Sequence, residues 1–292
     1  MKKENLFISI KPHDGVKGGG SNTFAWNFCR YLAKKGIPVT NHLWNASKAI
    51  IIAHNANLTT LKLAKLKGCF IIHRLDEEFR EDEPPVVKKR HNKIVQINKL
   101  ADQTVFQSEF VKNNVWPYLN SQNWNIIING ADPTIFKYQK SKGEYIGHIT
   151  NSIGDKKRLD LLEQAIQKYP DKQFMLVGNH NKSSIDFSQY RNAIIIGPVN
   201  KTELFQYHQQ MKCLYFPSER DPCPNTVVEA ILSGLPICYN EHGGTKEIVK
   251  NCGLPLDQFE ELLNQLPVFQ ERCAHRQDLY FDSVAEKYLD LM

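Results

Sequence analysis

The sequence predicts an α/β protein made of two Rossmann-like domains. Three observations support this prediction. Short apolar runs alternate with helical stretches along the chain, which is the rhythm of βαβ units and parallel sheets. A segment rich in turn residues and charge, around residue 140, divides the chain into two such series. With 292 residues, of which 41% are hydrophobic and 23% charged, the chain can bury two modest cores.

The first domain is expected over residues 1–140. A strand at Leu6–Ile10 leads through a Gly-rich turn into a helix with apolar residues at helical spacing. Further strands are expected at 37–40, 49–53, 70–73, 104–106 and 125–129, with helices at 58–66 and 86–100. Parallel sheets carry functional groups beyond the carboxyl ends of their strands, so His73 and Asp76 are candidate site residues.

The second domain is expected over residues 141–270, followed by a helical tail over residues 271–292. The alternation of apolar runs and helical patterns continues through this half of the chain. Strands are predicted at 145–149, 174–178, 193–199, 213–216 and 237–239, with helices that start near 159, 203 and 225.

The segment from Phe216 to Pro236 holds the clearest functional pattern. A strand ends at Phe216, a polar loop follows, and a helix with one apolar face runs from Asn225 to Gly234. Asn225 is expected to cap this helix, whose first N–H groups face the crevice beyond the strand ends, where a phosphate is favoured. Glu229 lies one turn further in, and its carboxylate suits a pair of sugar hydroxyls. The alternative is an N-capped helix with one exposed Glu.

A second Gly-rich turn follows the next strand. The residues from Glu241 to Ile248 read Glu-His-Gly-Gly-Thr-Lys-Glu-Ile and open another helix. Two helix N-termini are therefore expected to converge on one crevice. The earlier Gly-rich turn, around residue 18, lacks the Gly-x-Gly-x-x-Gly spacing of dinucleotide-binding proteins, so a dehydrogenase is not favoured.

Together these motifs resemble the donor-binding signature of the retaining glycosyltransferases of family 4, the glycosyl transferases group 1. That signature has two acidic residues eight positions apart, then Ala, Gly-x-Pro and Gly-Gly-x-x-Glu-Ile. Here the acidic residues are Asp221 and Glu229, with Asp in place of the usual first Glu. The family also has an Arg six residues before a Lys–Gly pair. Lys157 matches that Lys, while Asn151 stands at the Arg position and Arg158 at the Gly position.

The resemblance implies the GT-B fold, in which two Rossmann-like domains face a central cleft and the C-terminal helix crosses back to the first domain. It implies catalytic roles for Lys157, Arg158, Asp221 and His73. It places His73 and Asp76 on the acceptor side. The donor-binding residues that it implies are Gly19, Gly20, Asn151, Gly197, Val199, Ser218, Asn225, Thr226, Val227 and Glu229.

The implied activity is the transfer of a sugar from a nucleotide-diphosphate sugar, with a UDP-sugar as the first expectation, to a glycan, a lipid-linked acceptor or another acceptor. The implied reaction retains the anomeric configuration and uses no metal ion and no other cofactor. Two alternatives stay open. One is a GT-B nucleotide-sugar epimerase, which needs no acceptor. The other is a non-catalytic nucleotide-sugar-binding subunit, suggested by Asn151, Asp221 and the short first domain.

The net charge of +6 is unevenly distributed. Residues 1–140 hold 21 Lys and Arg against 11 Asp and Glu, whereas residues 141–292 hold 16 against 20. A basic first domain suits peripheral contact with an anionic membrane or an acidic acceptor, although lysine-rich surfaces are also common without a partner. No nucleic-acid recognition motif is found, so nucleic acid is not an expected partner.

Other features favour a cytoplasmic protein without a metal ion. No apolar run approaches 18 residues, and the segment before the first strand lacks the apolar stretch of a signal peptide. The seven cysteines include no Cys-x-x-Cys pair, which favours reduced thiols and argues against structural zinc. The acidic run from Asp76 to Glu83 is interpreted as a solvated loop, with a divalent-metal motif as the alternative.

Overall fold

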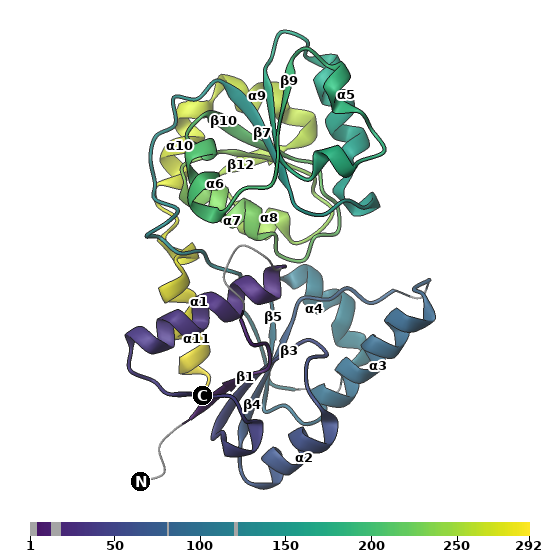
Figure 1. Cartoon of the computed structure of the whole chain (residues 1–292), viewed down its shortest axis with the longest axis vertical. Coiled ribbons are helices and arrows are strands. Elements are labelled where there is room, and N and C mark those ends of the chain that lie inside the picture. Colours follow the sequence, from purple (N-terminus) through teal and green to yellow (C-terminus); the bar gives the residue numbers. More distant parts are fainter. Residues whose placement is uncertain (1–4, 13–18, 81, 120–121) are drawn as a thin grey trace. The chain divides into compact units, whose positions relative to one another are not determined.

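A computed structural model describes residues 5–12, 19–80, 82–119 and 122–292 and divides the chain into two compact units. The first unit comprises Met1–Asn129 and Phe281–Met292, and the second comprises Gly130–Tyr280 (Figure 1). The sequence places the boundary near residue 140 and the start of the tail at residue 271. Both limits therefore differ from the observed division by about ten residues. Within the described residues, no helix combines the length and apolarity that crossing a bilayer requires.

The first unit is a parallel α/β layer structure. Its described strands form one sheet in the order β2-β1-β3-β4-β5-β6, and every pairing is parallel. The strands are β1 (Leu6–Ile8), β2 (Val39–Thr40), β3 (Lys48–Ile52), β4 (Phe70–Leu75), β5 (Gln103–Phe106) and β6 (Trp124–Ile126). The helices are α1 (Gly20–Lys34), α2 (Leu58–Leu66), α3 (Pro85–Asn98), α4 (Glu109–Val115) and α11 (Phe281–Asp290).

Alternation along strand β3 shows that both faces of this sheet are covered. Ile50 and Ile52 pack in one buried cluster with residues of α1, α4 and α11, whereas Ala49 and Ile51 pack in a second cluster with residues of α2. Burial on both faces explains why the strand is an uninterrupted apolar run. The sequence predicts this strand from that run alone.

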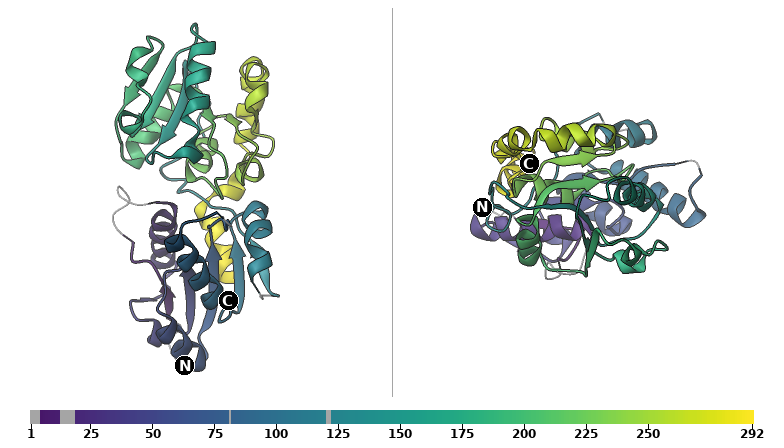
Figure 2. Two further views of the ribbon diagram at one scale, coloured as in Figure 1. Left: turned by 90° about the vertical axis from the view of Figure 1, so that its right-hand side faces the viewer. Right: turned by 90° about the horizontal axis from the view of Figure 1, so that it is seen from above.

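Helix α11, which ends the chain, belongs to the core of the first unit. Phe281 and Tyr288 contact Phe24 and Phe28 of α1, with ring centroids 5.1–6.3 Å apart. All four rings are buried. Figure 2 shows α11, in yellow, alongside the elements of the first unit. Aromatic packing of this kind stabilises the unit beyond the burial of area alone.

The second unit is also a parallel α/β structure. Its described strands form a sheet in the order β12-β11-β10-β7-β8-β9. The strands are β7 (Tyr145–Thr150), β8 (Phe174–Gly178), β9 (Ala193–Ile196), β10 (Met211–Phe216), β11 (Ile237–Tyr239) and β12 (Gly253–Pro255). The helices are α5 (Leu159–Lys168), α6 (Lys201–His208), α7 (Asn225–Leu232), α8 (Thr245–Val249), α9 (Phe259–Asn264) and α10 (Leu266–Cys273). The predicted pair of α/β domains with parallel sheets is confirmed.

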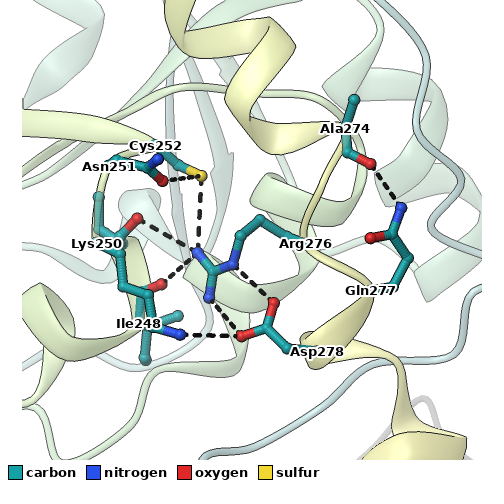
Figure 3. Close-up of polar contacts among 9 residues, drawn as sticks. Ile248, Lys250, Asn251, Cys252, Ala274, Arg276, Gln277 and Asp278 are labelled. Carbon is teal, nitrogen blue, oxygen red and sulfur yellow. Dashed lines mark hydrogen bonds and ion pairs between the residues drawn. The ribbon is translucent and has the colours of Figure 1, made fainter.

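The buried Arg276 connects the end of the second unit to the end of helix α8 and to Cys252. Its guanidinium donates to the carbonyl of Ile248, at 2.6 Å, and of Val249, at 3.3 Å, near the end of α8 (Figure 3). The same group contacts the sulfur of Cys252 at 3.6 Å and pairs with Asp278 at 2.8 Å. These contacts satisfy carbonyls that the short helix leaves without partners. A hydrogen bond with the thiol of Cys273, together with the hydrogen bond and charge of the Arg276 guanidinium, lowers the pKa of Cys252 to about 7.

Three of the predicted element limits that differ from the structure concern candidate site residues. Strand β4 continues to Leu75, so His73 lies inside the strand and not after it. Strand β9 ends at Ile196, so Gly197 and Val199 belong to the following loop. Helix α7 has Pro224 at its N-cap position and Asn225 as its first helical residue, so Asn225 is not the cap.

Candidate active site

Three loops of the second unit meet at the carboxyl edge of its sheet. They follow β7, β10 and β11, which are neighbours in the sheet. The loop after β10 lies between the other two, because the N–H of Glu219 donates to the carbonyl of Lys156 at 2.8 Å and that of Gly244 donates to the carbonyl of Asp221 at 2.9 Å. Ligands of open α/β sheets bind at this edge. The loop with the predicted acidic residue is thus held from both sides.

Lys157 and Asp221 form an ion pair across two of these loops. Lys157 ends a short 3-10 helix (Asp155–Lys157), and its Nζ lies 3.1 Å from Oδ2 of Asp221. The two side chains keep 23% and 20% of their surface exposed, so both charges are accessible from solvent. The structure therefore brings together two of the residues for which the resemblance implies catalytic roles.

Arg158 is the residue between the short 3-10 helix and α5, and its charge is already compensated. Its guanidinium contacts Asp160 at 2.8 Å and Glu219 at 3.0 Å, and these carboxylates raise its pKa above the usual value. Its backbone is left-handed, with φ 47° and ψ 49°, where Gly is favoured. The Gly that the family has here fits this conformation. Arg158 thus holds the Glu219 loop in place, whereas Lys157 has a single carboxylate partner.

Gly243 lets the loops after β10 and β11 approach closely. Its φ is +139°, and a Cβ placed there would lie 3.0 Å from both the amide nitrogen and the carbonyl oxygen of Asp221. Asp221 and Gly243 also form an isolated parallel bridge. The Gly-rich turn therefore fixes the position of Asp221.

Glu229 and Lys201 form a second ion pair. Glu229 lies on α7 with 2% of its surface exposed, and Nζ of Lys201, the first residue of α6, contacts its Oε1. The sequence identifies Glu229 as a ligand for sugar hydroxyls but gives no role to Lys201. A pairing between two helices 28 residues apart leaves no local signal in the sequence.

Buried hydroxyls lie beside the same edge. Ser218, which follows β10, and Thr245, which opens α8, are each about 1% exposed. Their side-chain oxygens have no hydrogen-bond partner among the described residues. Ser218 is a predicted donor-binding residue, whereas the sequence gives no role to Thr245. Of the neighbouring candidates on α7, Thr226 is half-buried and Val227 is buried.

The predicted donor-binding residues Asn151, Gly197 and Val199 lie on the loops after β7 and β9. The resemblance implies that Gly197 and Val199 belong to the nucleobase pocket. Asn151 is exposed, and its carbonyl accepts a hydrogen bond from the side chain of Asn179 at 2.6 Å. Gly197 is exposed, its carbonyl accepts from the N–H of Gly178 at 3.3 Å, and Val199 is half-buried. These loops are hydrogen-bonded to the end of β8.

In the first unit, the candidates Gly19 and Gly20 start helix α1, and both are exposed. Asp76 follows β4 directly. Its Oδ2 accepts from Oγ of Ser21 at 2.8 Å and from the guanidinium of Arg74 at 3.3 Å. Arg74 is fully buried, and its guanidinium also stacks on the ring of Phe24 at 4.2 Å. Asp76 is therefore a carboxylate held in place at the carboxyl edge of the first sheet.

The predicted catalytic and acceptor-side roles of His73 do not fit the structure. His73 is fully buried. Its Nε2 lies 2.8 Å from the carbonyl of Ala53, and the side chain of Asn98 donates to its Nδ1 from 3.1 Å. Burial lowers the pKa of His73 to about 4, so the ring is neutral at physiological pH. With both ring nitrogens occupied by protein groups, His73 supports the sheet.

No group of three or more His, Cys, Asp or Glu side chains in the described part of the chain is placed to hold a metal ion. The acidic run from Asp76 to Glu83 instead forms pairs with basic neighbours. Arg80 contacts Asp82, and Arg90 lies 3.8 Å from Glu77. Glu81 lies outside the described residues.

Comparison with known proteins agrees with this geometry. Residues 143–266 match the family model described as glycosyl transferases group 1. The predicted resemblance to the group 1 glycosyl transferases is confirmed. A curated relative from Haemophilus influenzae, named an uncharacterized glycosyltransferase, is 25% identical over 169 residues. The match covers 55% of this chain and 45% of that protein, so the chain matches about half the length of this relative.

Two solved structures share the fold over the whole chain. Sucrose-phosphate synthase from Thermosynechococcus elongatus has a TM-score of 0.75 at 14% identity, with 99% of this chain and 98% of that chain covered. Anabaena HepE in complex with UDP-glucose has a TM-score of 0.73 at 13% identity, with the same coverage. These two neighbours confirm the predicted GT-B fold class. The cleft between the two units stays a prediction.

Proposed function

We propose that this protein is a retaining glycosyltransferase of family 4 that takes a sugar from a nucleotide-diphosphate sugar. The observation that carries the proposal is the Lys157–Asp221 ion pair at the carboxyl edge of the second sheet. Transfer requires stabilisation of the departing diphosphate as the glycosidic bond loosens. Lys157 supplies a cation for this purpose without a metal ion.

The exposed ion pair suggests how the donor is received. The diphosphate competes with Asp221 for Nζ of Lys157, because a phosphate group is a stronger anionic partner than a single carboxylate. Asp221 is then free to accept hydrogen bonds from hydroxyls of the transferred sugar. Gly243 keeps the loop of Asp221 in place during this exchange. The ion pair of Arg158 and Glu219 holds the same loop from the side of β7.

We expect a UDP-sugar as the donor, which the HepE complex with UDP-glucose supports. We also expect an acceptor hydroxyl of a glycan or lipid-linked glycan to approach Asp76. With such an acceptor, the protein would act in polysaccharide synthesis. We also expect a cytoplasmic protein that contacts an anionic membrane surface peripherally. The excess of Lys and Arg in residues 1–140 supports the contact with an anionic surface.

The first experiment measures thermal unfolding with UDP, GDP, ADP, CMP and NAD on wild type, Lys157→Met and Lys142→Met. Lys142 is an exposed lysine before β7, at the opposite edge of the sheet, and serves as the matched control. A nucleotide at about 100 times its dissociation constant adds about 2.7 kcal/mol of stability. We expect one nucleoside diphosphate to stabilise wild type and Lys142→Met, and to stabilise Lys157→Met much less.

A second assay follows the products of UDP-glucose with and without a membrane glycolipid extract. Release of UDP that depends on the extract supports transfer. Isomerisation of the sugar nucleotide without any acceptor supports an epimerase. Binding without either reaction supports a non-catalytic subunit, and stabilisation by NAD alone refutes the proposed donor site.

A further inference from the structure

The ion pair of Lys201 and Glu229 is placed where stability alone gives little reason for it. Glu229 is 2% exposed on a helix that is otherwise mostly apolar, and its carboxylate contacts only one cation among the described residues. Buried ion pairs contribute little net stability, because the cost of removing both charges from water offsets their attraction. A pair of apolar side chains would stabilise this packing equally well. We therefore look for a function of the Lys201–Glu229 ion pair.

Lys201 also occupies a position that disfavours a cation. It is the first residue of α6, where the helix dipole and the free N–H groups favour negative charge. The local preference is met by Asn200 and Glu203, which form a capping box at this end of the helix. Lys201 adds positive charge there and thus acts against the preference of its own helix. The partner that compensates for this is the distant Glu229.

The contacts of Lys201 fix its ammonium group in one place. Its Nζ contacts Oε1 of Glu229 and lies 5.9 Å from the centre of the buried ring of Phe136. The Lys201 side chain keeps 32% of its surface exposed, so one side of the pair stays open to solvent. Among the described residues, the hydrogen bond and ion pair of the Glu229 side chain go to Oε1, so Oε2 has remaining capacity to accept hydrogen bonds.

The position of Lys201 in the chain links it to nucleotide binding. It is the first residue of α6 and lies two residues after Val199, which is on the loop between β9 and α6. We expect this loop to contact the nucleobase. Glu229 is proposed to bind sugar hydroxyls of the nucleotide. One ion pair thus joins the start of α6, next to the loop for the base, to the carboxylate for the ribose, both within the second unit.

We propose that Lys201 is a positioning residue for ribose recognition. It neutralises and orients Glu229 so that the carboxylate accepts hydrogen bonds from the 2′- and 3′-hydroxyls. The site therefore selects ribonucleoside diphosphates over their 2′-deoxy counterparts. This inference rests on the proposed donor site.

The test measures binding of UDP, GDP, ADP and CDP, and of the 2′-deoxy form of each, by isothermal titration calorimetry. The variants are Lys201→Met, Lys201→Arg, Glu229→Gln and the double variant Lys201→Met/Glu229→Gln. Lys142→Met is the control, because it makes the same change of charge at an exposed site. Thermal unfolding without ligand shows whether each variant is folded.

For the nucleotide that binds wild type, we expect the ribose form to bind about tenfold to a hundredfold more tightly than the 2′-deoxy form, since hydrogen bonds to a charged group are worth about 1.5–3 kcal/mol. Lys201→Met should reduce this ratio to about threefold or less. Lys201→Arg and Lys142→Met should keep it. In the Glu229→Gln background, the further change of Lys201 should have almost no effect, because Lys201 acts through Glu229.

Two outcomes overturn the inference, and they can be told apart. If no nucleoside diphosphate binds wild type, the proposed donor site fails and the inference fails with it. If one binds but Lys201→Met keeps the discrimination of wild type, or loses it equally in the Glu229→Gln background, only the role of Lys201 is refuted. A purely structural role would lower the unfolding temperature of Lys201→Met and leave the ratio unchanged.

Discussion

The carboxyl edge of the second sheet depends on the absence of a side chain at Gly178. Its φ is +110°, and a Cβ there would lie 1.9 Å from the carbonyl oxygen of Thr150, at the end of the neighbouring strand. Ordinary contacts start near 3.4 Å. Gly178→Ala therefore forces the ends of β7 and β8 apart by more than 1 Å, roughly a quarter of the usual strand spacing.

The cost of Gly178→Ala has three parts. The unfavourable backbone conformation costs about 1–3 kcal/mol. Overpacking of a close contact costs about 1–3 kcal/mol. The hydrogen bond from the N–H of Asn179 to the carbonyl of Thr150 is 2.9 Å long in the wild type. Its weakening costs about 1 kcal/mol. We expect the free energy of unfolding of the second unit to fall by about 3–7 kcal/mol.

Hydrogen exchange followed by mass spectrometry measures this effect locally, on peptides from β7 and β8. Gly154→Ala is the matched control. Gly154 lies in the loop after β7, its φ of 170° is extended, and a Cβ there meets no atom within 4 Å. We expect exchange in Gly154→Ala to match that of wild type. If Gly178→Ala changes the exchange of these strands by no more than the control does, the reasoning about this contact is refuted.

Three further predictions follow from buried and strained groups. Asp76→Ala removes the carboxylate beside the buried guanidinium of Arg74 and should lower the free energy of unfolding of the first unit by about 3 kcal/mol. Urea unfolding followed by tryptophan fluorescence tests this, since all four tryptophans lie in that unit, and a loss below about 1 kcal/mol would contradict it. Gly243→Ala should weaken UDP-glucose binding by about tenfold because it displaces Asp221, which is proposed to hold the transferred sugar, and calorimetry with unchanged affinity would refute this. Burial lowers the pKa of His180 to about 4, so the unfolded chain binds a proton near pH 5 that the folded chain does not. Stability from this group is complete above about pH 6.5 and falls by about 3 kcal/mol toward pH 4. His180→Gln should make the stability of the second unit less dependent on pH over that interval, and an unaltered dependence would argue against it.

Local patterns in the sequence predict most of the fold. The apolar runs that become β3, β8 and β10 are buried on both faces, so they appear as strands without any tertiary knowledge. The loop after β10 and the Gly-rich turn after β11 are also predicted, because phosphate-binding turns need Gly and helix starts at fixed spacing. The structure then adds that Asp221 and Gly243 lie against each other.

The misplacement of the candidate His73 relative to β4 has a physical cause. His73 and Arg74 are polar, so the apolar pattern of β4 stops before the strand itself does. Both side chains are buried because distant groups supply their hydrogen bonds, Ala53 and Asn98 for the one and Asn129 for the other. Compensation of this kind is long-range and leaves no periodic signal. The ion pair of Lys201 with Glu229 could not be predicted from the sequence for the same reason.

The division of the chain has a consequence for synthesis on the ribosome. The second unit is one continuous segment, whereas the first unit needs residues from both ends of the sequence. Domains generally fold as units, in the order in which they are made. Here the first segment emerges early but leaves Phe24 and Phe28 uncovered until Phe281 and Tyr288 arrive. The first segment therefore keeps a hydrophobic surface that chaperones can bind until Phe281–Met292 have been made.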